Sequence, residues 1–146
     1  MKINAFEAIY SRLLDLRKAY ETAANEGDRI SVQNAICALL DEIDETEETF
    51  SRICALYVRS RDDGNEYLDI NGVIRDKDVE SLVGCMRENG IDKFTFSSGW
   101  SSAVDTAWLL QQAGCRLEGL IEINSQYKDL KTGEHEKAHG YLFSVG

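Results

Sequence analysis

A serine-rich segment at 97–102 has the residue types of an anion site. Four serines flank Gly99 and Trp100 where a predicted strand at 93–96 gives way to a predicted helix. The first amides of a helix are unpaired, and together with the helix dipole they attract phosphate or carboxylate. Serines that simply cap the helix explain the same pattern, so both interpretations stay open. The candidate ligand-binding residues are Ser98, Gly99, Ser101 and Ser102.

A second candidate site is the acidic segment 41–48, where six of eight side chains are carboxylates. Such a row of charges can occupy a basic nucleic-acid channel as phosphates do, with fast and salt-sensitive binding. The alternative interpretation is a solvated helix face without a partner. The candidate partner-binding residues are Asp41, Glu42, Asp44, Glu45, Glu47 and Glu48.

The overall charge argues against direct binding to nucleic acid. The chain of 146 residues has 16 Lys and Arg against 26 Asp and Glu, which gives a net charge of −10, and no basic tail or patch is visible. The partner we expect is therefore a protein with a basic surface, such as a nuclease. Because no apolar run is long enough to span a bilayer and no signal peptide opens the chain, we expect a cytoplasmic protein without membrane contact.

Enzymatic and metal sites are weakly supported by the sequence. The segment 99–103 approximates a nucleophile elbow, but the chain is far shorter than an α/β-hydrolase, and neither a P-loop nor a dinucleotide-binding motif occurs. His135 and His139 lie in a polar stretch without nearby cysteines, so we expect them at the surface. The four cysteines form no C-x-x-C pair, which predicts reduced, mostly buried thiols. We expect no catalytic residue, no cofactor and no metal.

The amino-terminal half, 1–63, has the pattern of a long antiparallel helical hairpin. Apolar residues step by three and four through 4–26 and again through 28–63, with only Thr46 breaking the second stripe. Asn4 and Glu7 resemble a capping box, and Gly27 suits the turn after the first helix. The coiled-coil-like spacing predicts two helices crossing at a shallow angle. Because the second helix is longer, its far end must pack on the other half or form a dimer.

The carboxy-terminal half, 64–146, alternates helix and strand. Periodicity and turn residues predict the order α-β-α-β-β, and the segment 67–70 fits either a further short strand or a loop. The predicted elements are a helix at 76–89, a strand at 93–96, a helix from 101 or 102 to 113, a strand at 117–124, a polar connection at 125–139 and a final antiparallel strand at 140–145. The fold class is therefore α+β, a helical hairpin packed with a small mixed sheet in one compact unit.

The segments 94–103 and 114–124 resemble a family of small acidic proteins, largely of unknown function, carried on mobile elements of gut Firmicutes. The resemblance covers about 90–146 and carries over no catalytic residue. It implies a setting in which accessory and counter-defence proteins occur, including acidic anti-CRISPR proteins that block nucleic-acid grooves.

Three functional hypotheses follow from these features. The leading one is a non-enzymatic binding protein, a counter-defence inhibitor of the DNA-mimic kind, that presents the acidic segment to a basic protein. The second is a small ligand-binding protein or enzyme that uses the serine segment as an anion site. The third is a structural homodimer formed through the helical hairpin.

Overall fold

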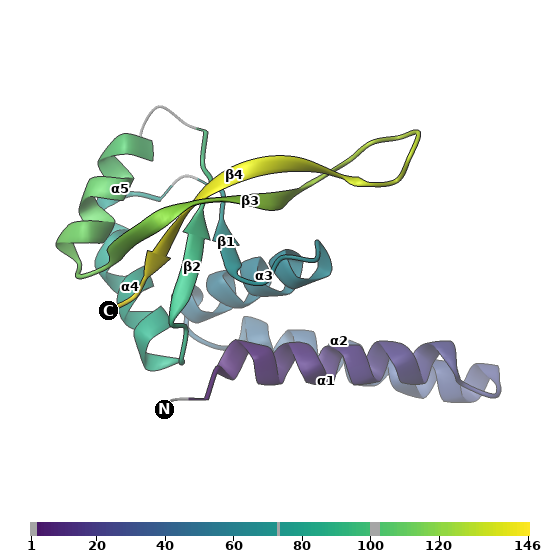
Figure 1. Ribbon diagram of the computed structural model, residues 1–146. Coiled ribbons are helices and arrows are strands. Elements are labelled where there is room, and N and C mark those ends of the chain that lie inside the picture. The colour runs from purple at the N-terminus through teal and green to yellow at the C-terminus, as the bar shows by residue number, and fades with distance from the viewer. Residues whose placement is uncertain (1–2, 73, 100–102) are drawn as a thin grey trace.

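The α+β class is confirmed by the computed structural model, which describes residues 3–72, 74–99 and 103–146 (Figure 1). The helices are α1 (Ala5–Glu21), α2 (Glu26–Asp44), α3 (Glu48–Asp62), α4 (Val79–Glu88) and α5 (Ala103–Gln112), and a short 3-10 turn, η1 (Asp76–Asp78), precedes α4. The strands are β1 (Leu68–Ile70), β2 (Lys93–Phe96), β3 (Arg116–Lys128) and β4 (His135–Ser144). Within the described residues, no helix is both long and apolar enough to cross a membrane.

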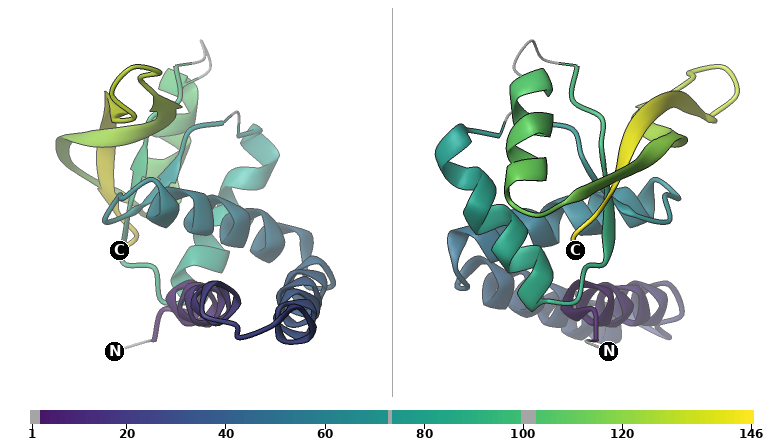
Figure 2. Two further views of the ribbon diagram at one scale, coloured as in Figure 1. Left: turned by 90° about the vertical axis from the view of Figure 1, so that its right-hand side faces the viewer. Right: turned by 60° about the vertical axis from the view of Figure 1, so that its left-hand side comes forward.

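The single long helix predicted over 28–63 is wrong, because the chain breaks between α2 and α3. Thr46, the residue that interrupts the apolar stripe, lies in the break, and its hydroxyl donates a hydrogen bond to the carbonyl oxygen of Ile43. The break turns α3 toward the sheet, where Ile53 and Cys54 become buried. Burial of this apolar face outweighs the helix propensity of the intervening acidic residues. Figure 2 shows α3 running obliquely across α1 and α2.

The helical hairpin itself is present, formed by α1 and α2 (Figure 1). Asn4 caps α1 as predicted, because its side-chain oxygen accepts hydrogen bonds from the backbone N–H groups of Phe6 and Glu7. Gly27 does not end the first helix: it lies inside α2, which Asn25 caps through the N–H of Asp28. The turn between the two helices therefore ends in an asparagine cap of α2, where the sequence suggested a glycine that ends the first helix.

The four strands form one mixed sheet in the order β1-β2-β4-β3. β1 and β2 are parallel, whereas β4 is antiparallel to both of its neighbours, β2 and β3. β2 and β3 therefore run in the same direction, with β4 between them. Helix α3 lies beside β1. The face that carries Phe94, Phe96 and Phe143 is covered by α4 and α5 (Figure 2).

The polar connection predicted at 125–139 is wrong, because β3 and β4 continue through it as a long hairpin (Figure 1). Its tip is closed by Asp129, whose carboxylate accepts hydrogen bonds from the N–H groups of Lys131 and Thr132, and by Gly133 at φ 73°. The hairpin projects beyond the core, so both of its faces can be polar. The apolar alternation that predicts a strand is therefore missing there.

A cluster of buried apolar side chains runs from α1 to the end of β4. Phe6 on α1 is fully buried, and its ring lies 4.8 Å from the ring of Phe50 and 6.0 Å from the ring of Tyr57. On the rim, Arg17 and Asp62 form a bidentate ion pair at 2.8 and 3.2 Å. These contacts fix α1 against α3, so the helical hairpin is held to the sheet at one end.

Candidate functional site

The acidic segment forms the corner at which α2 turns into α3. Asp41, Glu42 and Asp44 lie in the last turn of α2, Glu45 and Glu47 lie in the break, and Glu48 begins α3. All six side chains are exposed. The prediction that these carboxylates lie along one straight helix is therefore wrong, because the chain bends between α2 and α3. We refer to these six residues as the acidic corner.

The acidic corner is electrostatically unfavourable for the helix that carries most of it. The last turn of α2 holds acidic residues and no basic one, and the carboxyl end of a helix is the negative end of its dipole. Arg12 of α1 approaches Glu42 at 4.0 Å, but both side chains are mostly exposed, so this pair contributes little. The helix dipole therefore disfavours the carboxylates at this end of α2.

We expect the double variant Asp41→Asn and Asp44→Asn to be more stable than the wild type. Removing two charges from the negative end of α2 gains about 1 kcal/mol, or roughly 3 °C in melting temperature. Thermal unfolding at low and at high salt measures the gain, which salt should shrink. Asp28→Asn is the matched control, because Asp28 lies in the first turn of the same helix and its loss should lower stability. Equal shifts for both changes would contradict this electrostatic explanation.

An apolar groove adjoins the acidic corner. It has a volume of about 270 Å³ and lies between α1, α2 and α3. Its lining residues are Ile9, Leu13, Leu39, Leu40, Ile43, Asp44, Ser51, Cys54, Ala55 and Val58. Asp44 belongs both to the groove and to the acidic corner, so the two features are continuous. Leu40 is 46% exposed, which leaves apolar surface open to a partner.

The serine segment is only partly described. Ser101 and Ser102 lie outside the described residues, so the predicted anion site is not tested there. The hydroxyl of Ser97 donates a 2.7 Å hydrogen bond to Asp69 of β1. Ser98 and Gly99 line a wide apolar cavity beside α5.

Asp69 is a buried carboxylate that sequence reasoning missed. It is 7% exposed and accepts hydrogen bonds of 2.7 Å from the hydroxyls of Thr95 and Ser97. Burial raises its pKa, and the two hydroxyls oppose the rise. Its backbone N–H donates to Ser60, so the residue ties α3, β1 and β2 together. The sequence held one sign of this buried carboxylate, because Asp69 lies between two apolar residues, Leu68 and Ile70.

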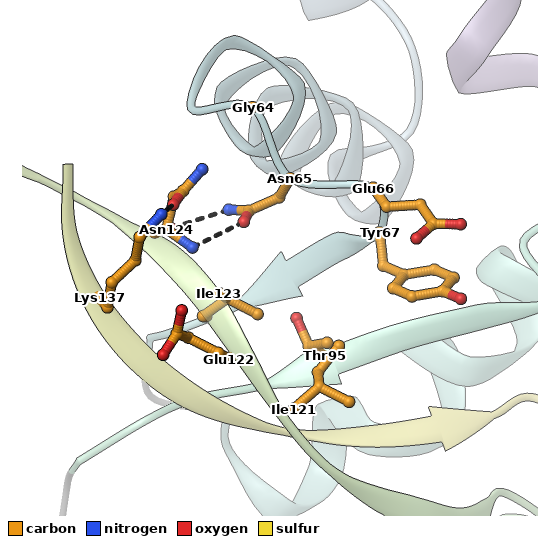
Figure 3. A pocket seen from close by; sticks show the side chains of 10 residues that line it. All are labelled: Gly64, Asn65, Glu66, Tyr67, Thr95, Ile121, Glu122, Ile123, Asn124 and Lys137. Carbon is orange, nitrogen blue, oxygen red and sulfur yellow. Dashed lines mark hydrogen bonds between the residues drawn. The ribbon is translucent and has the colours of Figure 1, made fainter. Parts of the chain in front are cut away.

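A small polar cavity lies on the sheet face opposite α5. Figure 3 shows Asn65, from the connection between α3 and β1, directed at Asn124 of β3. The Asn65 side chain and the Asn124 backbone exchange two hydrogen bonds of 2.8 Å. The ammonium group of Lys137 donates a hydrogen bond to the side-chain oxygen of Asn124. The cavity measures about 160 Å³, with Thr95 in its lining. It has room for a few water molecules, and its amides are already paired with protein groups.

Among the described residues, no group of three or more His, Cys, Asp or Glu side chains is arranged to hold a metal ion. His139 is exposed as predicted, but His135 is half-buried, with Nδ1 2.8 Å from the carbonyl oxygen of Ser125. Cys54 and Cys115 are buried, whereas Cys37 is exposed, contrary to the expected burial. Burial raises the pKa of Cys54 to about 11, which keeps this thiol protonated and unreactive.

Comparison with protein families gives one match. A model described as a domain of unknown function, DUF7698, matches residues 52–145, which is more than half of the chain. The chain belongs to the DUF7698 family. The comparisons with curated proteins and with solved structures found no match.

The DUF7698 match covers most of α3 and the whole sheet, together with α4 and α5. The polar cavity and the cavity beside α5 therefore lie within the DUF7698 region. The acidic corner and the helices α1 and α2 precede it. The groove next to the acidic corner is built from both parts, because α3 supplies one wall and α1 and α2 supply the others.

Proposed function

We propose that this DUF7698 protein is a non-catalytic binding protein that holds a basic, amphipathic segment of a partner protein. The observation that carries the proposal is the continuity of the acidic corner with the apolar groove, which share Asp44. An amphipathic helix places apolar residues in such a groove while its charged face meets the rim. The carboxylates would attract a basic partner and orient it.

The chemistry of the groove supports a helical ligand of this kind. Leu40 and Ile43 lie three residues apart on α2, and Ala55 and Val58 are spaced in the same way on α3, so each helix presents an apolar wall to the groove. Carboxylates lie at the end of the groove where α2 meets α3. A partner with leucines on one face and lysines or arginines beside them satisfies both features.

A basic nucleic-acid-binding protein is the partner class that we would test first. The resemblance of residues 94–103 and 114–124 to accessory proteins of mobile elements supports this choice, as does the net charge of −10. The counter-defence role remains part of the proposal and rests on that resemblance. The bend between α2 and α3 favours contact with a basic protein segment over imitation of a straight phosphate row.

The test is the affinity for a peptide of leucine and lysine, about 18 residues long, with all leucines on one helical face. We expect the variant D44N/E45Q/E47Q/E48Q to bind this peptide roughly tenfold to a hundredfold more weakly than the wild type at low salt. The reason is that four exposed charge pairs are each worth about 0.2–1 kcal/mol. Fluorescence anisotropy of the labelled peptide measures the loss, and high salt should reduce the difference.

Two matched controls separate the site from general charge. The variant E118Q/E122Q/E134Q/E136Q removes the same charge from the β3–β4 hairpin and should bind nearly as well as the wild type. Leu40→Ser should weaken binding, whereas Leu14→Ser, with a similar exposure of 42%, should not. Equal affinity of the wild type and the acidic-corner variant would overturn the proposal. A mass that doubles with concentration, and is lost in Leu40→Ser, would assign the groove to a second copy.

A further inference from the structure

A wide apolar cavity lies between α5 and the sheet, far from the acidic corner in the chain. Its volume is about 560 Å³, within the range of small-molecule sites. Helix α5 forms one wall, strands β3 and β4 form the floor, and Ser98 and Gly99, which follow β2, complete the lining. The lining residues are Ser98, Gly99, Ala103, Val104, Ala107, Trp108, Gln111, Leu117, Tyr141 and Phe143.

The walls of this cavity are apolar and partly aromatic, and they are exposed. Trp108 is 62% exposed, Tyr141 is 48% exposed and Leu117 is 46% exposed. An indole, a phenol and a leucine that meet around one hollow expose much more apolar surface than scattered surface residues do. Phe143 lies in the floor and is buried, so the hollow reaches the core.

The polar groups of the cavity are few and uncharged. None of its lining residues is Asp, Glu, Lys, Arg or His. In the part of the chain that the structure describes, the side-chain amide of Gln111 and the hydroxyl of Tyr141 have no hydrogen-bond partner. A few convergent polar groups on an apolar wall orient a ligand without attracting ions. The chemistry therefore differs from that of the acidic corner and from that of an anion site.

We propose that the cavity between α5 and the β3–β4 strands binds an uncharged, flat and largely apolar small molecule. Its ring system lies between Trp108 and Tyr141, and a polar substituent accepts or donates a hydrogen bond at Gln111 or Tyr141. Offset or edge-to-face contacts with both rings favour an aromatic ligand over an acyl chain. A charged ligand would lose its hydration without gaining an ion pair.

The test uses N-phenyl-1-naphthylamine, a neutral aromatic probe whose fluorescence rises in apolar surroundings. We expect saturable binding of one probe per chain with a dissociation constant on the order of 10 µM. High salt should leave this affinity unchanged, because no charge lines the cavity. Leu117→Asp should weaken binding at least tenfold, and Trp108→Ser several-fold; both side chains are exposed enough for the fold to tolerate the changes.

Leu130→Asp is the matched control, because Leu130 lies at the tip of the β3–β4 hairpin and is fully exposed. It should bind the probe like the wild type. The proposal is overturned if the wild type shows no saturable binding, or if Leu117→Asp and Leu130→Asp bind equally well. It is also overturned if one probe binds per two chains and Leu117→Asp abolishes a dimer, since the face would then be an interface between copies.

Discussion

Gly90→Ala is expected to lower the stability of the protein by about 3 kcal/mol, or roughly 10 °C in melting temperature. Gly90 follows α4 with a φ of 83°, a conformation that costs an L-residue about 1–2 kcal/mol. A Cβ atom there would lie 2.5 Å from the carbonyl oxygen of Ile3 and 2.8 Å from its carbonyl carbon. The backbone before α1 would have to move, which endangers the hydrogen bond from Ala5 N to Asn89 O.

The control for this change is Gly133→Ala in the hairpin tip. Gly133 has a φ of 73°, but a Cβ there would meet no atom within 4 Å. It should therefore lose only the conformational part, about 1 kcal/mol. Thermal or denaturant unfolding of both variants isolates the steric part of the Gly90 effect. Equal losses at the two glycines would show that the close approach of Ile3 to Gly90 contributes nothing.

Phe6→Ala is expected to cost about 3–5 kcal/mol, because it removes a fully buried ring. Phe6 contacts Phe50 and Tyr57 of α3, so its loss opens a cavity where α1 meets the rest of the core. Leu14→Ala on the same helix is the control and should cost under about 1 kcal/mol, since Leu14 is 42% exposed. Urea denaturation measures both, and similar losses would contradict the anchoring role of Phe6.

The local elements could be predicted where their signals are local. The cap at Asn4, the end of a helix near residue 89 and the strand at 93–96 all match the structure. Each depends on a turn residue or on apolar periodicity within a few positions. The α+β class followed from the same signals.

The break between α2 and α3 depends on distant contacts and could not be predicted with local rules. The apolar stripe continues through 28–63 with only Thr46 against it, as in one uninterrupted helix. What decides the break is the packing of Ile53 and Tyr57 in the core shared by α3, α4 and β1. The polar end of the β3–β4 hairpin was missed for the opposite reason, since it packs against nothing that would require an apolar pattern.

The candidate sites also differ in whether they depend on local sequence signals or on contacts between distant residues. The composition and exposure of the acidic corner could be predicted, but its bent shape and the adjoining groove could not, since the groove needs side chains from α1, α2 and α3 together. The hydrogen bond that Asp69 accepts from Thr95 depends on the pairing of β1 with β2. The cavity beside α5 depends on Tyr141, which is far from α5 in the sequence. Sequence spacing gives no sign of such long-range neighbours.

The most direct test of the binding proposal is the footprint of the leucine-lysine peptide in the two-dimensional amide NMR spectrum of the protein. The proposal predicts that the shifts that change on binding cluster at Leu40, Ile43, Asp44, Ser51 and Ala55, where groove and acidic corner meet. Changes confined to α5 or to the β3–β4 hairpin, or no changes at a peptide concentration that saturates the anisotropy signal, would contradict it.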